Sequence, residues 1–154
     1  MVYVTVVGGA LCSKEEREMA RQVGSEVARR GGVVICGGGS GVMEAAAEGA
    51  AQAGGIVIGI LPGSSTLEGN PHLSFAVATG LGEARNAVIA RTADAMIAVG
   101  GEFGTLSEIA LALKMGKPVV GLKSWSIKSP RGFDHSIVQA ATSLEAVENI
   151  YKKR

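Results

Sequence analysis

The stretch from Thr92 to Ala110 constrains the fold most, because it reads as a buried strand, a glycine turn and a helix in direct succession. Ala95–Val99 is an uninterrupted apolar run, typical of a parallel strand that is buried on both faces. Gly100 and Gly101 let the backbone approach a ligand closely, and Thr105 opens a segment with apolar residues at helical spacing. The free N–H groups and positive dipole end of that helix predict an anion site, with a tight turn that holds no ligand as the alternative.

A second loop of the same kind lies earlier in the chain. The apolar run Val33–Cys36 ends in the glycine loop Gly37-Gly38-Gly39-Ser40-Gly41, and the alanine-rich stretch Val42–Ala53 is expected to follow as a helix. The first apolar run, Val2–Val7, also ends in two glycines, Gly8 and Gly9. Glycine accounts for 23 of the 154 residues, roughly twice its usual share of about 7%. Because these glycines follow apolar runs and form no repeat, they indicate ligand loops rather than low complexity.

The rest of the chain continues the alternation of strands and helices. Ser13 and Glu16 form a capping box for a helix that runs to Arg29-Arg30. Further strands are expected at Ile56–Leu61, Leu73–Ala78, Pro118–Leu122 and Ile137–Ala140, and further helices at Glu83–Thr92, Leu106–Met115 and Leu144–Tyr151. Ser64–Pro71 is expected to be a polar loop and a candidate lid, and Ser124–His135 an irregular segment.

Apolar strands that alternate with helices predict one α/β domain over residues 1–154. Right-handed crossovers then give a Rossmann-like, doubly wound parallel sheet in a three-layer α/β/α arrangement. Ligands of such sheets bind beyond the carboxyl ends of the strands, and both glycine loops belong to that edge.

Two common phosphate-binding loops do not fit the sequence. The dinucleotide fingerprint needs GxGxxG after the first strand and an acidic residue at the end of the next, whereas GGALCS follows the first strand and Cys36 ends the second. The P-loop needs a lysine after its last glycine, whereas Thr105 follows Gly104. A nicotinamide dinucleotide and triphosphate hydrolysis are therefore disfavoured. The ligand that remains compatible with the sequence is a phosphate group, as in a monophosphate, held by backbone amides.

Composition and charge exclude several other classes. The net charge is +1 with acids and bases interspersed, so neither nucleic acid nor a membrane surface is an expected partner. No apolar stretch reaches the length of about 18 residues that a transmembrane helix needs, and Met1–Val4 reads as a strand rather than a signal peptide. Cys12 and Cys36 have no metal-site spacing and indicate reduced thiols in a cytoplasmic protein, with a disulfide between them as the alternative. His72 and His135 lack ligand partners in the sequence, so no metal site is expected.

At the two glycine loops the chain resembles the LOG family of nucleoside-monophosphate phosphoribohydrolases, once labelled possible lysine decarboxylases. The family loop PGGxGTxxE is similar to residues Gly100–Glu108, and its earlier glycine loop is similar to Gly37–Met43. The likeness runs from Val2 to about Leu122. It is closer still to a short branch related to molybdenum-cofactor carrier proteins and, more distantly, to the DNA-processing DprA/Smf proteins.

The sequence departs from the family pattern at three positions. Gly100 replaces the proline of the loop, and Glu102 replaces its second glycine. Asn86 replaces the lysine that follows the family's arginine. Glu102 brings a negative charge close to the expected phosphate, which weakens anion binding unless its side chain turns away.

The resemblance places the family's chemistry on Arg85 and Glu108. Cleavage of an N-ribosidic bond builds positive charge on the sugar. A carboxylate beside the sugar either stabilises that charge or activates the attacking water. Glu108 lies one helical turn beyond Gly104, and Arg85 is expected to hold it or to clamp the phosphate. The alternative is a dipole-favoured glutamate beside a surface arginine. The residues expected to bind phosphate or nucleotide are Gly8, Gly9, Gly37, Gly38, Gly39, Ser40, Gly41, Gly100, Gly101, Gly104 and Thr105.

The expected activity is hydrolysis of a nucleoside 5′-monophosphate to free base and ribose 5-phosphate, with no cofactor. The alternative is a non-enzymatic carrier of a molybdopterin-type cofactor, because Glu102 and Asn86 alter both motifs on which the family's catalysis depends. The resemblance also implies a homodimer formed through helices beside the site. Trp125, the single tryptophan, is open to two roles, stacking on a base or filling a subunit contact. Lysine decarboxylation has no support, because it needs a cofactor-bearing lysine.

Overall fold

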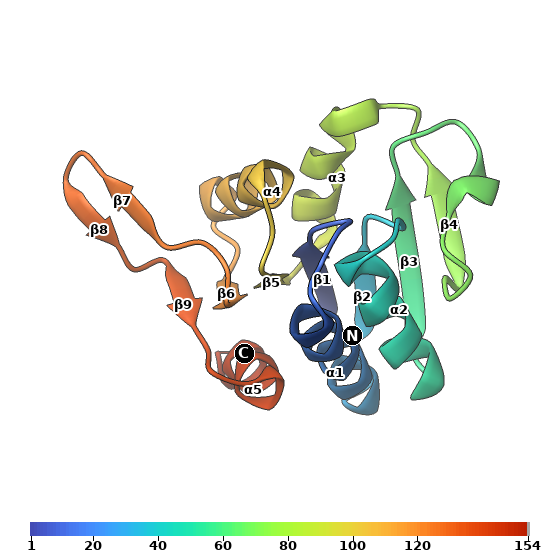
Figure 1. The fold of residues 1–154 in the computed structure, drawn as a ribbon, viewed down its shortest axis with the longest axis horizontal. Coiled ribbons are helices and arrows are strands. Elements are labelled where there is room, and N and C mark those ends of the chain that lie inside the picture. Colours follow the sequence, from blue (N-terminus) through green and yellow to red (C-terminus); the bar gives the residue numbers. More distant parts are fainter. Residues whose placement is uncertain (154) are drawn as a thin grey trace.

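A computed structural model describes residues 1–153 and contains a seven-stranded sheet in the order β4-β3-β2-β1-β5-β6-β9 (Figure 1). All six pairings between neighbouring strands are parallel. The strands are β1 (Tyr3–Gly8), β2 (Val33–Cys36), β3 (Ile56–Leu61), β4 (Phe75–Ala78), β5 (Ala95–Val99), β6 (Val119–Leu122) and β9 (Ile137–Gln139). The helices are α1 (Lys14–Arg29), α2 (Val42–Gln52), α3 (Arg85–Thr92), α4 (Phe103–Lys114) and α5 (Ser143–Lys152).

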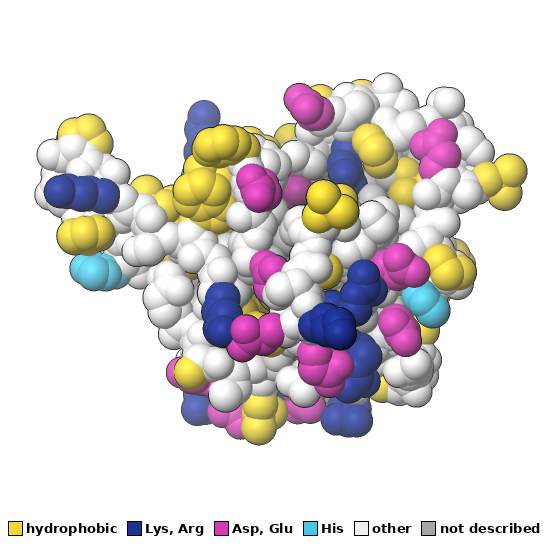
Figure 2. All heavy atoms as spheres, viewed as in Figure 1, with side chains coloured by type: hydrophobic (Ala, Val, Ile, Leu, Met, Phe, Trp, Pro, Cys, Tyr) yellow, Lys and Arg dark blue, Asp and Glu magenta, His cyan; other side chains and the backbone are white. Residues whose placement is uncertain are grey.

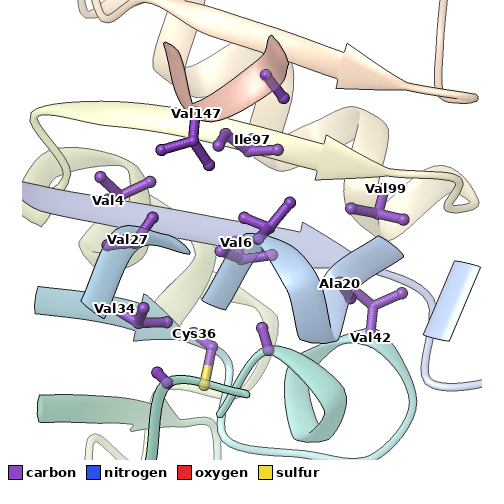
Figure 3. Close-up of a cluster of buried hydrophobic side chains, with 14 of the residues drawn as sticks. Val4, Val6, Ala20, Val27, Val34, Cys36, Val42, Ile97, Val99 and Val147 are labelled. Carbon is purple, nitrogen blue, oxygen red and sulfur yellow. The ribbon is translucent and has the colours of Figure 1, made fainter. Parts of the chain in front are cut away.

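Helices cover both faces of the sheet, so the three-layer α/β/α fold expected from the sequence is confirmed. In Figure 1, α1, α2 and α5 lie on one side of the sheet, and α3 and α4 lie on the other. Alternate residues of each central strand enter the two layers. In β5, Ile97 and Val99 pack with α1, α2 and α5 (Figure 3), whereas Met96 and Ala98 pack with α3 and α4. This double burial explains why the strands are continuously apolar in sequence.

Two glycines bring α1 and α2 unusually close together. A Cβ atom at Gly24 of α1 would overlap the backbone of Ala46, and one at Gly49 of α2 would overlap the carbonyl of Arg21. The two helices therefore pack backbone against backbone. Because both helices begin at the carboxyl edge of the sheet, after β1 and β2, this contact also fixes the spacing of the first two loops.

The segment expected to be irregular, Ser124–His135, contains an antiparallel hairpin. Its strands are β7 (Ile127–Ser129) and β8 (Gly132–Asp134), and it extends from the body as an arm (Figures 1 and 2). Three-residue strands are too short to show a period-two pattern, which is why the sequence did not reveal them. The loop Ser64–Pro71 contains one short 3₁₀ turn, Thr66–Glu68.

Among residues 1–153, the structure holds no helix that is both long enough and apolar enough to cross a membrane. Positive and negative side chains alternate over α1 on the face that Figure 2 shows. Three of the ion pairs join residues of α1 and its C-cap residue Arg30, namely Arg21 with Glu18 and both Arg29 and Arg30 with Glu26.

Candidate functional site

A cavity of about 590 Å³ opens at the carboxyl edge of the sheet, beside the ends of β1 and β5. This is the point where the strand order reverses, because the chain runs outward from β1 to β4 and then returns to β5. Crevices at such reversal points are the usual ligand sites of doubly wound sheets. The lining residues are Gly8, Gly9, Ala10, Leu11, Met43, Pro62, Gly82, Glu83, Arg85, Asn86, Glu102, Gly104, Thr105 and Glu108.

Arg85 is the first residue of α3, and the backbone holds its guanidinium in the cavity wall. Its Nη1 donates to the carbonyl of Gly37 at 2.7 Å and to the carbonyl of Ile60 at 2.8 Å. Its Nε is buried and has no hydrogen-bond partner among residues 1–153. A buried donor without a partner is costly and is a feature found at functional sites.

Glu108 enters the same cavity from α4 and is partly buried. Burial raises the pKa of its carboxyl group to about 7, and the nearby charge of Arg85 opposes that rise. A carboxyl group with a pKa this close to neutrality, in a cavity and beside an arginine, is typical of functional sites. The structure therefore brings together the two residues to which the family resemblance assigned the chemistry.

The raised pKa of Glu108 predicts how stability depends on pH. Between about pH 4.3, the ordinary pKa of a glutamate, and about pH 7, the folded protein keeps a proton that the unfolded chain has lost. Burial of this carboxyl therefore costs stability increasingly as the pH rises through this range. Glu108→Gln, which cannot ionise, should melt at a higher temperature than the wild type at pH 8 and at nearly the same temperature at pH 4.5. Thermal unfolding at both pH values measures this difference, and equal melting temperatures at pH 8 would contradict it.

The glycine loop 37–41 supports the cavity rather than lining it. The carbonyls of Gly38 and Gly39 accept hydrogen bonds from the backbone N–H and the side-chain amide of Asn70, at 2.8 and 3.0 Å. Ser40 donates through Oγ to the carbonyl of Ala10 at 3.3 Å, and a Cβ atom at Gly41 would overlap the carbonyls of Gly9 and Ala10. Gly41 therefore serves a contact between backbone segments, and the missing side chain of Gly37 leaves room for the guanidinium of Arg85. Asn70 also ties the Ser64–Pro71 segment to this loop, and that segment contributes no residue to the cavity.

The β5–α4 loop contacts the cavity only at its last residue, Glu102, and the first turn of α4 adds Gly104 and Thr105. Gly100 and Gly101, with φ of 55° and 99°, do not line the cavity. A Cβ atom at Gly100 would overlap the carboxylate of Glu16. Proline, which needs φ near −65°, cannot take this conformation, and this explains the departure from the family loop at Gly100.

Helix α4 begins three residues earlier than the expected Leu106, at Phe103. Glu102 is its N-cap residue and makes no side-chain cap hydrogen bond. Thr105 therefore does not open the helix, and its buried side chain packs against Gly101 instead. The capping signal failed because glycine and threonine at this turn serve close packing rather than helix initiation.

The cavity is richer in acids than the sequence indicated. Glu83, Glu102 and Glu108 line it, and Arg85 is the one basic residue among the lining residues. Glu83 and Glu102 are exposed, so water solvates their carboxylates. Asn86, which replaces the lysine of the family motif, donates through Nδ2 to Oγ of Ser107 at 3.1 Å and so joins α3 to α4. Glu83 was missed because a single glutamate before a helix carries no distinctive sequence signal.

Proteins of similar sequence include an uncharacterised protein of Archaeoglobus fulgidus, 46% identical over 80% of this chain and 81% of its own length. The probable cytokinin riboside 5′-monophosphate phosphoribohydrolase LOGL9 of rice (Oryza sativa subsp. japonica) is 38% identical over 98 residues, 60% of this chain and 42% of the rice protein. Among solved structures, the molybdenum cofactor binding protein of Rippkaea orientalis superposes with a TM-score of 0.89 at 33% identity, covering 99% of this chain and 96% of that one. The family model that matches residues 1–152 is that of the SLOG cluster4 family. The chain belongs to the SLOG cluster4 family, which confirms the LOG-like branch that its two glycine loops indicated.

Proposed function

We propose that this protein hydrolyses the N-glycosidic bond of a nucleoside 5′-monophosphate. The observation that carries the proposal is that Arg85 and Glu108 meet in one cavity at the reversal point of the sheet, where burial raises the pKa of Glu108 to about 7. The similarity to the rice phosphoribohydrolase supports this chemistry, although the chain spans less than half of that protein's length.

In this proposal, different residues of the cavity bind the phosphate and act on the ribose. The N-terminal turn of α4, at Gly104 and Thr105, offers N–H groups and the positive dipole end to the phosphate. Glu108 lies one turn further along α4, where its carboxylate can stabilise the positive charge that develops on the ribose. Water adds to C1′ of the ribose as the bond from C1′ to the base breaks, and the base leaves with a proton.

Base release tests the proposal directly. Purified protein is incubated with AMP, GMP or N6-substituted AMP, and free base and ribose 5-phosphate are quantified by chromatography. Equimolar appearance of both products, absent with Glu108→Ala, is the expected result. If no monophosphate yields free base above the level of Glu108→Ala, the hydrolase proposal is wrong.

A carrier of a molybdopterin-type cofactor is the second candidate. The similarity to the molybdenum cofactor binding protein of Rippkaea orientalis extends over 99% of this chain, and Glu102 and Asn86 replace residues of the hydrolase motifs. A carrier needs only a cavity and an anion site. A ligand at 100 times its dissociation constant stabilises the fold by about 2.7 kcal/mol, so thermal unfolding distinguishes the two candidates. A shift with molybdopterin cofactor and none with monophosphates favours the carrier.

We also propose a homodimer in the cytoplasm. Two apolar side chains near the site are uncovered: Phe103, the first residue of α4, is 75% exposed, and Leu81, in the turn before α3, is 52% exposed. Cys12 and Cys36 are free thiols, which fits a reducing compartment. Light scattering at micromolar concentration should give twice the chain mass of 15.6 kDa, and Phe103→Asp should reduce it to the monomer. A wild-type mass equal to one chain would contradict the dimer.

A further inference from the structure

The connection between β6 and β7 holds the loop that precedes α4. Oγ of Ser124 donates to the carbonyl of Gly100 at 2.6 Å, and the indole Nε1 of Trp125 donates to the carbonyl of Glu102 at 3.2 Å. The backbone N–H of Gly100 also donates to the carbonyl of Leu122, at 3.0 Å. Three hydrogen bonds from one short segment therefore reach the two ends of the Gly100–Glu102 loop.

This loop needs outside support because its own sequence offers little. Gly100 and Gly101 have positive φ angles and no side chains that could anchor them. Glu102 has no side-chain bond to the turn that it caps. Without a cap, the first turn of a helix is free to fray. That first turn carries Gly104 and Thr105, which line the cavity.

Trp125 is itself fixed by two contacts, one through its backbone and one through its ring. Its backbone carbonyl accepts a hydrogen bond from Nε2 of Gln139, in β9, at 3.3 Å. Its ring lies 5.9 Å from the ring of Phe103, the first residue of α4. Trp125 does not line the cavity. Neither base stacking nor a subunit contact is needed to account for its place in the fold.

We propose that Trp125 and Ser124 are positioning residues that hold the N-terminal turn of α4 in its ligand-binding arrangement. Their effect on ligand affinity rests on the proposed function, in which that turn binds the phosphate. Their effect on the order of the Gly100–Glu102 loop is independent of the proposed function. Removing the indole N–H lets Glu102 and the following amides fluctuate, so phosphate affinity falls while the chemistry at Arg85 and Glu108 is retained.

Hydrogen exchange of the ligand-free protein tests the mechanical part. Trp125→Phe removes the N–H and keeps an aromatic ring beside Phe103, and Ser124→Ala removes the second hydrogen bond. Each should accelerate amide exchange at Gly100 and Leu106, whose N–H groups donate to the carbonyls of Leu122 and Glu102, by up to about tenfold, as expected for the loss of one hydrogen bond. Val147→Ala, a core change in α5 that destabilises the fold away from the loop, is the control. Acceleration no greater than in Val147→Ala would overturn the proposal.

Ligand measurements test the functional part. For AMP as substrate, Trp125→Phe and Ser124→Ala should each raise KM several-fold and leave kcat within about twofold, whereas Val147→Ala should change neither at a temperature well below its melting point. If the wild type binds and cleaves no monophosphate, the proposed function fails, and the exchange experiment still decides the role of Trp125. If AMP is cleaved but the variants lower kcat and not KM, the positioning proposal fails and the proposed function stands.

Discussion

Replacing Glu108 with glutamine should lower the turnover of a nucleoside monophosphate by about 100-fold or more and leave its dissociation constant within about threefold. Positioned acids, bases and charge-stabilising carboxylates commonly contribute 10²–10⁴-fold to rate. Glutamine keeps the size of the side chain and removes the charge that would face the ribose. In the proposed function, phosphate binding rests on the backbone amides of Gly104 and Thr105, which line the cavity and which the substitution does not touch. Steady-state kinetics together with calorimetric titration separate the two effects.

Glu83→Gln is the matched control, because Glu83 also lines the cavity but is exposed. It should change turnover by less than about threefold. Equal losses in Glu83→Gln and Glu108→Gln would show that general charge in the cavity matters and that Glu108 has no specific chemical role. Under the carrier alternative, neither substitution changes a turnover, since there is none to change.

The pH dependence of turnover offers an independent check on Glu108. If its carboxylate stabilises the positive charge on the ribose, kcat/KM, which reports the pKa of the ligand-free protein, should rise with pH through the raised pKa of about 7 and then level off. If its protonated form instead donates a proton to the leaving base, kcat/KM should fall over the same range. A profile flat from pH 6 to pH 8 would contradict both roles.

The sequence predicted the sheet well because parallel strands buried on both faces are continuously apolar. It also placed Arg85 and Glu108 in one site, although 23 positions separate them, because the family resemblance fixed which two residues to expect. It could not place Trp125 or Asn70. Both act through hydrogen bonds to carbonyls that are distant in sequence, and no local pattern marks such contacts.

The part that glycines play in lining the cavity was overestimated from the sequence. A glycine that lets a ligand approach the backbone and a glycine that lets another part of the protein approach have the same sequence signature. At Gly41 the approaching group is the first loop of the chain, at Gly9 and Ala10. At Gly100 it is the Glu16 side chain. The two glycine loops therefore contribute to the cavity mostly by packing against residues around it. Among the predicted glycines, only Gly8, Gly9 and Gly104 line it.

Gly41→Ala should accordingly act on stability first and on ligand binding through it. Gly41 has φ of 70° and ψ of −129°, far from the conformations that residues with a Cβ atom favour. The added methyl group would also press on the carbonyls of Gly9 and Ala10. Backbone strain and overpacking each cost about 1–3 kcal/mol, so unfolding should need about 3 kcal/mol less. For a chain of this size, that loss corresponds to a melting temperature lower by about 6–12 °C.

Gly54→Ala separates strain from overlap, because Gly54 has φ of 76° but no neighbouring atom within 4 Å of its Cβ position. It should cost about 1 kcal/mol, the usual price of a left-handed conformation for alanine, and leave AMP affinity unchanged. Gly41→Ala should also weaken AMP binding, since Gly9 and Ala10 line the cavity and must move. Thermal unfolding and calorimetric titration of the two variants give the comparison. Equal losses of stability would mean that the Gly41 contact with the first loop carries no weight, and that its positive φ alone accounts for the glycine.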